Sequence, residues 1–184
     1  MPNPDTVNLQ LKALYERHSG LTPALSEALY EAASVCLNKH HKSPVELAII
    51  RNGGITKRKV EFETPSTTAL NAWANDIDTT ETGAYGVCLA AVEVEEQLVA
   101  VRRAETLTGA DWYVAAVGTE SDDLENCYRL EISGLDTGNR SAVKARLLQK
   151  VQQTRRGTSN LPAIASVVGF KEKAVAIQKV SEIE

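Results

Sequence analysis

Apolar and polar positions alternate along the chain with two different periods, and each change of period marks an expected element. Apolar residues spaced three and four positions apart predict helices over residues 8–18, 22–42, 66–74, 81–96 and 140–154. Runs rich in β-branched and aromatic residues predict strands over 45–51, 55–63, 98–104, 111–118, 127–133, 161–170 and 173–180. This mixed order of helices and strands predicts an α/β (α+β) fold.

A polar break from Asn75 to Thr80 divides the chain into two parts. Residues 1–78 are expected to form an N-terminal subdomain of helices and a β-hairpin that turns at Asn52-Gly53-Gly54. Residues 79–184 are expected to form a core domain with the order helix, three-strand meander, helix, strand. The helix over residues 81–96 is apolar nearly all round and is therefore expected to be buried.

The strand over residues 127–133 has one apolar face and one polar face. Because side chains alternate along a strand, Glu131 shares a face with Arg129 and Ser133. Asp111 follows Gly109-Ala110 at the start of the preceding strand, where its carboxylate is expected to approach Glu131. Two carboxylates that converge from neighbouring strands supply the hard oxygen ligands that Mg²⁺ prefers. Asp111 and Glu131 are therefore the candidate metal-binding and catalytic acids.

Asp111 before the hairpin and Glu131 in Leu130-Glu131-Ile132-Ser133 resemble the metal-binding acids of the PD-(D/E)xK superfamily, whose fold is restriction-endonuclease-like. The resemblance implies a restriction-endonuclease-like core and a Mg²⁺-dependent endonuclease that acts on DNA phosphodiesters. It also implies a bacterial role in restriction, repair or anti-phage defence. In that superfamily a lysine normally follows the third-strand acid by two positions, and here that position is Ser133.

Lys144 is the predicted substitute for the missing lysine. On a helical wheel it falls beside Leu147 and Leu148, so its stem is expected to lie against the sheet and its ammonium to reach the acids. The alternative is that Lys144 only extends its ammonium to solvent from the edge of the core.

A second resemblance rests on the three segments Gly109-Ala110-Asp111-Trp112-Tyr113, Tyr128-Arg129-Leu130-Glu131-Ile132-Ser133-Gly134 and Leu161-Pro162-Ala163. Together they resemble a group of small bacterial proteins over about residues 80–180, and that group implies no function. Because some members of the PD-(D/E)xK superfamily are inactive, the alternative function is a non-catalytic protein-interaction subunit that uses the fold as a scaffold. Ser133 and the acidic pI of 5.5 favour this alternative.

Charge is segregated along the chain. Six cations and no acid lie between residues 139 and 158, whereas residues 76–96 carry six acids and no base. The residues expected to face phosphate are Arg140, Lys150, Arg155 and Arg156. The net charge of −4 argues against non-specific binding to nucleic acid. Trp112 and Tyr113 are expected either to stack on bases or, as the more ordinary alternative, to lie in the core and at the sheet edge.

The expected partners are DNA or a protein encoded by a neighbouring gene. A homodimer is expected only by analogy with nucleases that cut two strands. No apolar run reaches the about 18 residues that cross a bilayer, and residues 1–5 lack the features of a leader peptide, so a cytoplasmic protein is expected. The three cysteines Cys36, Cys88 and Cys127 are expected to be reduced and buried.

Several single residues keep two interpretations. Asp111 is either a metal ligand or the cap of the Gly109 loop, and Glu131 is either a ligand or an ion-pair partner of Arg129 or Arg103. Cys36 and His40 are four residues apart, which is a spacing compatible with metal ligands. Glu93 on the buried helix needs a partner, which is expected to be Arg103 or a metal. His18 and His41 are expected to be exposed.

Overall fold

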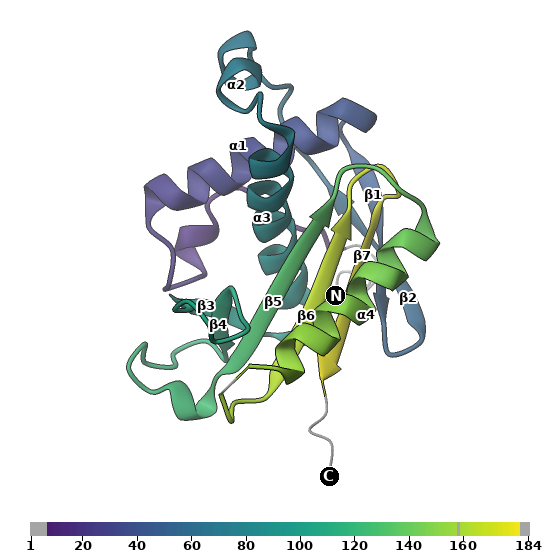
Figure 1. Cartoon of the computed structure of the whole chain (residues 1–184). Helices are drawn as coiled ribbons and strands as arrows, with labels where there is room; N and C mark the ends of the chain where they lie inside the picture. The colour runs from purple at the N-terminus through teal and green to yellow at the C-terminus, as the bar shows by residue number, and fades with distance from the viewer. Residues whose placement is uncertain (1–6, 158, 181–184) are drawn as a thin grey trace.

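A computed structural model describes residues 7–157 and 159–180, which form an α+β fold around one seven-stranded sheet (Figure 1). The helices are α1 (Pro23–His40), α2 (Thr67–Ala72), α3 (Asp76–Glu96) and α4 (Arg140–Arg155), with short 3-10 turns η2 (Leu14–Glu16) and η3 (Leu124–Asn126). The strands are β1 (Val45–Arg51), β2 (Gly54–Val60), β3 (Val99–Arg103), β4 (Trp112–Ala115), β5 (Tyr128–Leu135), β6 (Ala163–Gly169) and β7 (Ala174–Val180).

The sheet has the order β2-β1-β7-β6-β5-β4-β3 and is mostly antiparallel. Only the pairs β1–β7 and β5–β6 are parallel. The second of these pairs needs a crossover, which α4 provides between β5 and β6. The elements from α3 to β6 follow the predicted order of helix, three strands, helix and strand.

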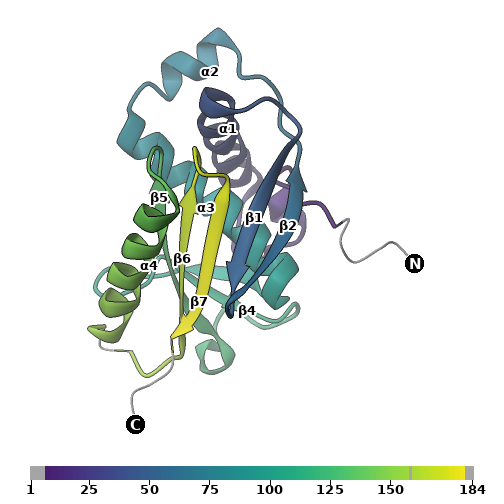
Figure 2. The same cartoon turned by 90° about the vertical axis from the view of Figure 1, so that its right-hand side faces the viewer.

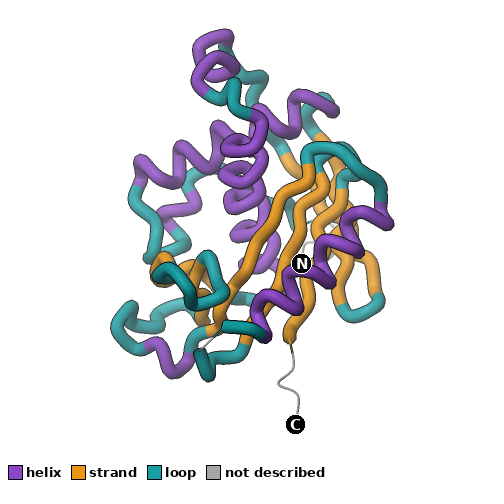
Figure 3. The backbone as a smooth tube through the Cα atoms, viewed as in Figure 1, coloured by secondary structure: helices purple, strands orange, loops and turns teal. Residues whose placement is uncertain are grey.

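The helices lie on both faces of the sheet. One face is covered by α1 and α3, and the other by α4 (Figures 1 and 2). Figure 3 shows the strands as a continuous layer between these helices. Leu130 and Ile132 of β5 pack in the core beneath α3, whereas Glu131 pairs with Lys150 of α4, so the two predicted faces of this strand are observed.

The two sides of the expected boundary at residues 78 and 79 share one sheet and one core. The β1–β2 hairpin joins the sheet through β7, and α1 packs against α3 in the main hydrophobic cluster. The boundary itself falls inside α3, and the outermost residues of both expected segments lie outside the described residues.

The predicted break before the buried helix is shorter than expected. Asn75 ends it, because its Oδ1 accepts hydrogen bonds from the backbone N–H groups of Ile77 and Asp78 and so caps α3. Asp76 to Thr80 is therefore the first turn of the helix. The helix predicted over residues 22–42 is observed as α1, with Thr22 as its N-cap and Pro23 at its first position.

The predicted helix over residues 8–18 is wrong. This segment contains only η2, and Leu9 forms a bridge with Val60 at the edge of the sheet. Leu9, Leu11 and Leu14 are all buried, so the apolar spacing of the segment reflects contact with the core and not an amphipathic helix. Leu148, which was expected to lie beside Lys144 against the sheet, is 51% exposed.

The prediction that His18 is exposed is also wrong, because its side chain is completely buried. Its Nδ1 accepts a hydrogen bond from the backbone N–H of Ala100, and its Nε2 lies 3.1 Å from Glu93. Arg17 donates to the same carboxylate at 2.7 Å. Glu93 therefore has Arg17 and His18 as partners, where Arg103 or a metal was predicted. These two contacts join the N-terminal segment to the end of α3.

Gly134 allows α3 to cross β5 at short range. A Cβ at this position would lie 2.5 Å from the backbone oxygen of Thr80. We expect Gly134→Ala to lower the free energy of unfolding by about 1–3 kcal/mol, because the helix must move away from the strand. Urea denaturation measures this loss. Gly53→Ala is a poor control because Gly53 has positive φ, so Gly54→Ala, whose nearest neighbour is 3.5 Å away, serves instead. Equal losses in the two variants would contradict the expectation.

Candidate functional site

Asp111 and Glu131 are cross-strand neighbours. Trp112 pairs with Leu130 in the antiparallel register of β4 and β5, and the backbone N–H of Asp111 donates to the carbonyl of Leu130 at 2.8 Å. Asp111 therefore lies opposite Glu131, one residue before β4 begins. Both side chains line a hollow of about 430 Å³ whose rim includes Arg103 and Arg156. The structure thus brings the two predicted acids together.

Asp111 is held by donors from three different elements. Its Oδ2 accepts from the backbone N–H of Ile132 at 2.7 Å, and its Oδ1 accepts from the hydroxyl of Tyr85 in α3 at 2.9 Å. Arg103 donates to the backbone oxygen of Asp111 and lies 3.9 Å from its carboxylate. The Arg103 guanidinium also lies over the rings of Tyr85 and Trp112, which fixes its direction. These contacts orient the Asp111 carboxylate towards β5 and α3, and not towards the Gly109 loop as its cap.

Tyr85 links Asp111 to a third acid. Its hydroxyl lies 2.9 Å from Glu81, one turn earlier in α3, as well as 2.9 Å from Asp111. A phenol carries one proton, so it donates to only one of the two carboxylates at a time. Glu81 lies at the side of the site and adds a carboxylate that the sequence interpretation did not include.

Glu131 pairs with Lys150. The ammonium of Lys150 lies 2.7 Å from Oε1 of Glu131, and the side chains of both residues are mostly buried, at 18% and 5% exposure. The lysine reaches the acid from α4, since β5 and α4 pack face to face. Its second contact is with Gln153 at 3.2 Å. The lysine beside the acids is therefore Lys150.

Both acids have carboxyl pKa values above the ordinary range. Burial raises the pKa of Asp111, although the Ile132 N–H, the Tyr85 hydroxyl and Arg103 oppose the effect. Burial also raises the pKa of Glu131, the negative charge of Asp111 raises it further, and Lys150 opposes both effects. Burial and the charge of Asp111 likewise raise the pKa of Tyr85, so it remains a proton donor at neutral pH. The two carboxylates repel each other in a partly desolvated place, where a cation would stabilise them.

Lys144 lies away from the two acids, so the prediction that its ammonium reaches them is wrong. It is exposed on α4 and lines a separate hollow with Arg51 and Lys179, between α4 and the strands β7 and β1. The helical period explains the difference. Lys150 is seven residues after the buried Val143 and so belongs to the sheet-facing stripe, whereas Lys144 follows Val143 directly and points away.

A second hollow, of about 480 Å³, adjoins the first. Lys150, Ser133 and Glu81 line it, together with Arg146, whose guanidinium lies 3.5 Å from the Ser133 hydroxyl. Ser133 therefore has the cation of Arg146 beside it. Glu131 borders one hollow and Lys150 the other, so their ion pair stands between the two spaces.

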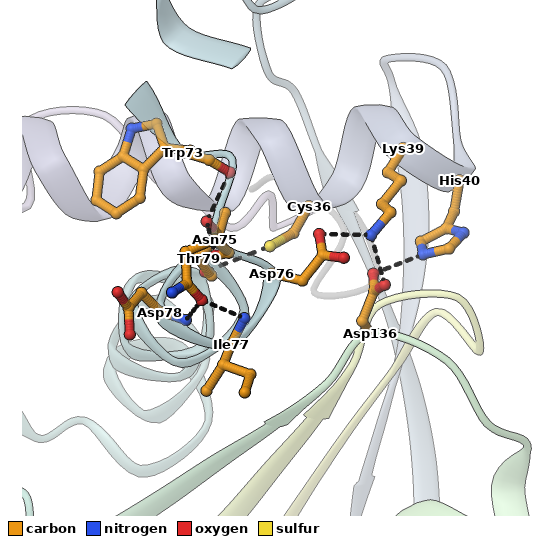
Figure 4. Close-up of polar contacts among 10 residues, drawn as sticks. All are labelled: Cys36, Lys39, His40, Trp73, Asn75, Asp76, Ile77, Asp78, Thr79 and Asp136. Atoms are coloured by element: carbon orange, nitrogen blue, oxygen red, sulfur yellow. Dashed lines mark hydrogen bonds and ion pairs between the residues drawn. The ribbon is translucent and has the colours of Figure 1, made fainter. Parts of the chain in front are cut away.

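The far end of the second hollow contains two more acids, Asp76 and Asp136 (Figure 4). Lys39 bridges them at 3.0 and 2.7 Å, and His40 lies 2.8 Å from Asp136. Burial alone would raise the pKa of Asp136, but Lys39 and His40 outweigh it and hold this pKa below the usual range. This end of the hollow is therefore a satisfied ion-pair cluster that joins α1, α3 and the end of β5.

Cys36 and His40 do not form a metal site. The thiol of Cys36 donates to the carbonyl of Thr79, whereas the His40 ring turns to Asp136 (Figure 4). Among residues 7–157 and 159–180, no three His, Cys, Asp or Glu side chains converge as a ready-made metal site. All three cysteines are free and buried, as predicted. In the same residues, no helix has the length and apolar character needed to cross a bilayer.

The four residues expected to face phosphate do not share one surface hollow. Arg156 lines the hollow of the two acids, and Lys150 lines the adjoining one. Arg155 lines a third hollow at the end of α4, and Arg140 pairs with Glu172 at the other end of the helix. Trp112 and Tyr113 are 1% and 4% exposed, so the core interpretation holds for Trp112 and neither ring is available to stack on bases.

No family model, curated protein or solved structure matches this chain. Its function is therefore inferred from the geometry of its own residues. The sequence interpretation did not place Tyr85 and Glu81 of α3 at the site. It expected Lys150 to face phosphate and did not identify it as the partner of Glu131. A sequence signal existed for each, because Glu81 and Tyr85 are four residues apart on one helix face and Lys150 has the spacing of the buried stripe.

The raised pKa values give the site a pH-dependent effect on stability. The folded protein holds protons on Asp111 and Glu131 more tightly than the unfolded chain does. In the unfolded chain the two carboxyl groups have the ordinary pKa values of 3.8 and 4.5. Their contribution to stability is present below these values and is lost as pH rises through the folded pKa values. We expect the unfolding free energy of the wild type to fall with rising pH relative to an Asp111→Asn, Glu131→Gln variant, starting near pH 4. Urea denaturation at several pH values measures the difference, and parallel curves would contradict it.

Proposed function

We propose that the elements α3-β3-β4-β5-α4-β6 form a restriction-endonuclease-like core and that the site on it is a Mg²⁺-dependent phosphodiesterase acting on DNA in bacterial defence. One observation carries the proposal. Two mostly buried carboxylates lie opposite each other, Asp111 just before β4 and Glu131 on β5, and the charge of Asp111 disfavours that of Glu131. A mostly buried lysine lies 2.7 Å from Glu131. Neighbouring carboxyl groups with raised pKa values are a feature of functional sites, and this supports the proposal beside the geometry.

The donor chemistry fits Mg²⁺. The candidate ligands are the hard carboxylate oxygens of Asp111 and Glu131, with Glu81 beside them across Tyr85. Mg²⁺ in proteins usually binds through one or two carboxylates, completed by water and substrate phosphate, so a closed cage of protein ligands is not required. When bound, the ion would polarise the phosphodiester and make the attacking water more acidic.

The protein's own cations have separate roles in this proposal. Lys150, in place of Lys144, would hold the attacking water by exchanging its bond with Glu131 for a bond to that water. Arg103 and Arg156, on the rim of the same hollow, would bind the phosphate and stabilise the negative charge that develops on it. Arg103 is suited to this because the rings of Tyr85 and Trp112 already fix its guanidinium.

The test is cleavage of supercoiled plasmid by the purified chain with Mg²⁺ or Mn²⁺. We expect nicked or linear product from the wild type, none in EDTA, and at least about a hundredfold less from Asp111→Asn or Glu131→Gln. Cleavage that is equal in the wild type and both variants, or that is missing from all three, would remove the claim.

The second candidate is a non-catalytic subunit that binds a protein partner. It is favoured by one specific observation: each acid already has protein partners, Asp111 in the Ile132 N–H and Tyr85, and Glu131 in Lys150. On this account the acids fix β4, β5, α3 and α4 to one another. Asp111→Asn and Glu131→Gln would then change stability and co-purification with a partner encoded nearby, while Mn²⁺ would leave the melting temperature of the wild type unchanged.

A further inference from the structure

The hollow that contains Lys144 is separate from the site of the two acids. It has a volume of about 630 Å³ and lies between α4 and the adjacent halves of β7 and β1. In Figure 2, β7 lies between α4 and the β1–β2 hairpin. This volume is within the range of about 300–1,000 Å³ that is usual for small-ligand sites.

The floor and one wall of this hollow are apolar. Ile50 from β1, Ala176 from β7 and Val143 and Leu147 from α4 form one cluster, in which Ile50 and Leu147 are only partly buried. Leu148, on the same helix, is half exposed at its edge. The apolar surface available here is therefore continuous from helix to sheet, and a ligand that covers it gains the free energy of removing it from water.

The charged residues that line the hollow are all cations: Arg51, Arg140, Lys144 and Lys179. Three of them are already neutralised. Arg51 and Lys179 share the buried carboxylate of Glu96, and Arg140 pairs with Glu172. Lys144 has no hydrogen bond or ion pair to any part of the chain that the structure describes. The positive charge left for a ligand is therefore at one place, on the α4 wall.

We propose that this hollow binds a small amphipathic anion, namely an apolar chain or ring that carries one carboxylate or phosphate group. The anionic group lies at Lys144, and the apolar body extends over Leu147 and Ala176 towards Ile50. A single head group fits because the unneutralised charge is at one wall. An acidic helix of a partner protein would instead need free cations along both sides of its apolar stripe. The inference is independent of the proposed nuclease activity.

The test is calorimetric titration of the full chain with hexanoate, octanoate and decanoate, below the concentrations at which they form micelles. We expect each added methylene to strengthen binding by about fourfold until the hollow is full. Decyl phosphate distinguishes a preference for phosphate from one for carboxylate. Decyltrimethylammonium, which has the same chain with a cationic head, is expected to bind at least tenfold more weakly than decanoate.

Two variants place the ligand. Lys144→Glu is expected to weaken decanoate binding by at least tenfold with little change in melting temperature, because Lys144 is exposed. Lys42→Glu is the matched charge reversal at an exposed position outside the hollow and should bind as the wild type does. The proposal is overturned by equal binding of the ammonium compound, by unchanged binding in Lys144→Glu, or by no binding of any of the anions. It is also overturned if a synthetic acidic amphipathic helix binds there and decanoate does not.

Discussion

Lys150→Ala is expected to reduce DNA cleavage by at least about a hundredfold, whereas Lys144→Ala is expected to leave it within about twofold of the wild type. Lys150 is the only cation recorded within hydrogen-bonding distance of Glu131 in the described part of the chain, and Lys144 lines a different hollow. The two residues are on the same helix and carry the same charge, so the comparison isolates position from the total charge of α4. Initial rates of plasmid nicking with Mn²⁺ measure both variants.

Two controls accompany this comparison. Melting temperatures show whether Lys150→Ala leaves Glu131 as an unpaired buried charge that destabilises the fold. Lys150→Arg keeps the charge but changes the shape of the donor, and so separates charge compensation from the positioning of water. Equal loss of cleavage in Lys150→Ala and Lys144→Ala would mean that α4 contributes only general positive charge, and Lys150 would lose its assigned role.

Arg129→Ala is expected to have the largest effect on stability among the residues near the site. Arg129 is 6% exposed, and its guanidinium donates to the backbone carbonyls of Leu161, Thr108 and Thr154. These carbonyls belong to the segment before β6, the loop before Asp111 and the end of α4. Because an unsatisfied buried carbonyl costs about 1–3 kcal/mol, we expect the free energy of unfolding to fall by at least about 3 kcal/mol. Urea denaturation measures it.

Arg102→Ala is the matched control for Arg129→Ala. Arg102 is on β3, and its recorded ion pair is an exposed one with Glu105. Such surface pairs contribute about 0–1 kcal/mol, so a small change is expected. If both variants lost the same stability, the buried carbonyl contacts of Arg129 would not be the connection that joins the three segments.

The sequence predicted most of the fold because most elements have a regular pattern bounded by turn chemistry. Thr22-Pro23 lies at the start of α1, and Asn52-Gly53 forms the turn of the hairpin. Runs of β-branched residues predicted the positions of β3 to β7. Residues 8–18 misled the prediction because irregular chain packed on a core can bury leucines at helical spacing. The sheet order could not be read either, since the pairing of β1 with β7 joins segments more than a hundred residues apart.

The candidate site shows the same division. The period of two on β5 and the glycine before Asp111 were enough to bring the two acids together. The choice of lysine failed because Leu148 was assigned to the buried stripe of α4, which turned the predicted helix face towards Lys144. The observed buried stripe of α4 consists of Val143, Val151 and Thr154, and Lys150 lies on the same face of the helix. His18 was misjudged because nothing in its local sequence indicates a partner as distant as Glu93.

Asp111 and Glu131 are proposed to hold a divalent metal ion together. Titration of the wild type with Mn²⁺, followed by the loss of the free-ion signal in electron paramagnetic resonance, tests it without reference to a DNA substrate. We expect saturable binding of Mn²⁺ that is lost in both Asp111→Asn and Glu131→Gln and retained in Lys144→Ala. Binding that persists unchanged in the two acid variants, or a wild type that takes up no Mn²⁺, would contradict it.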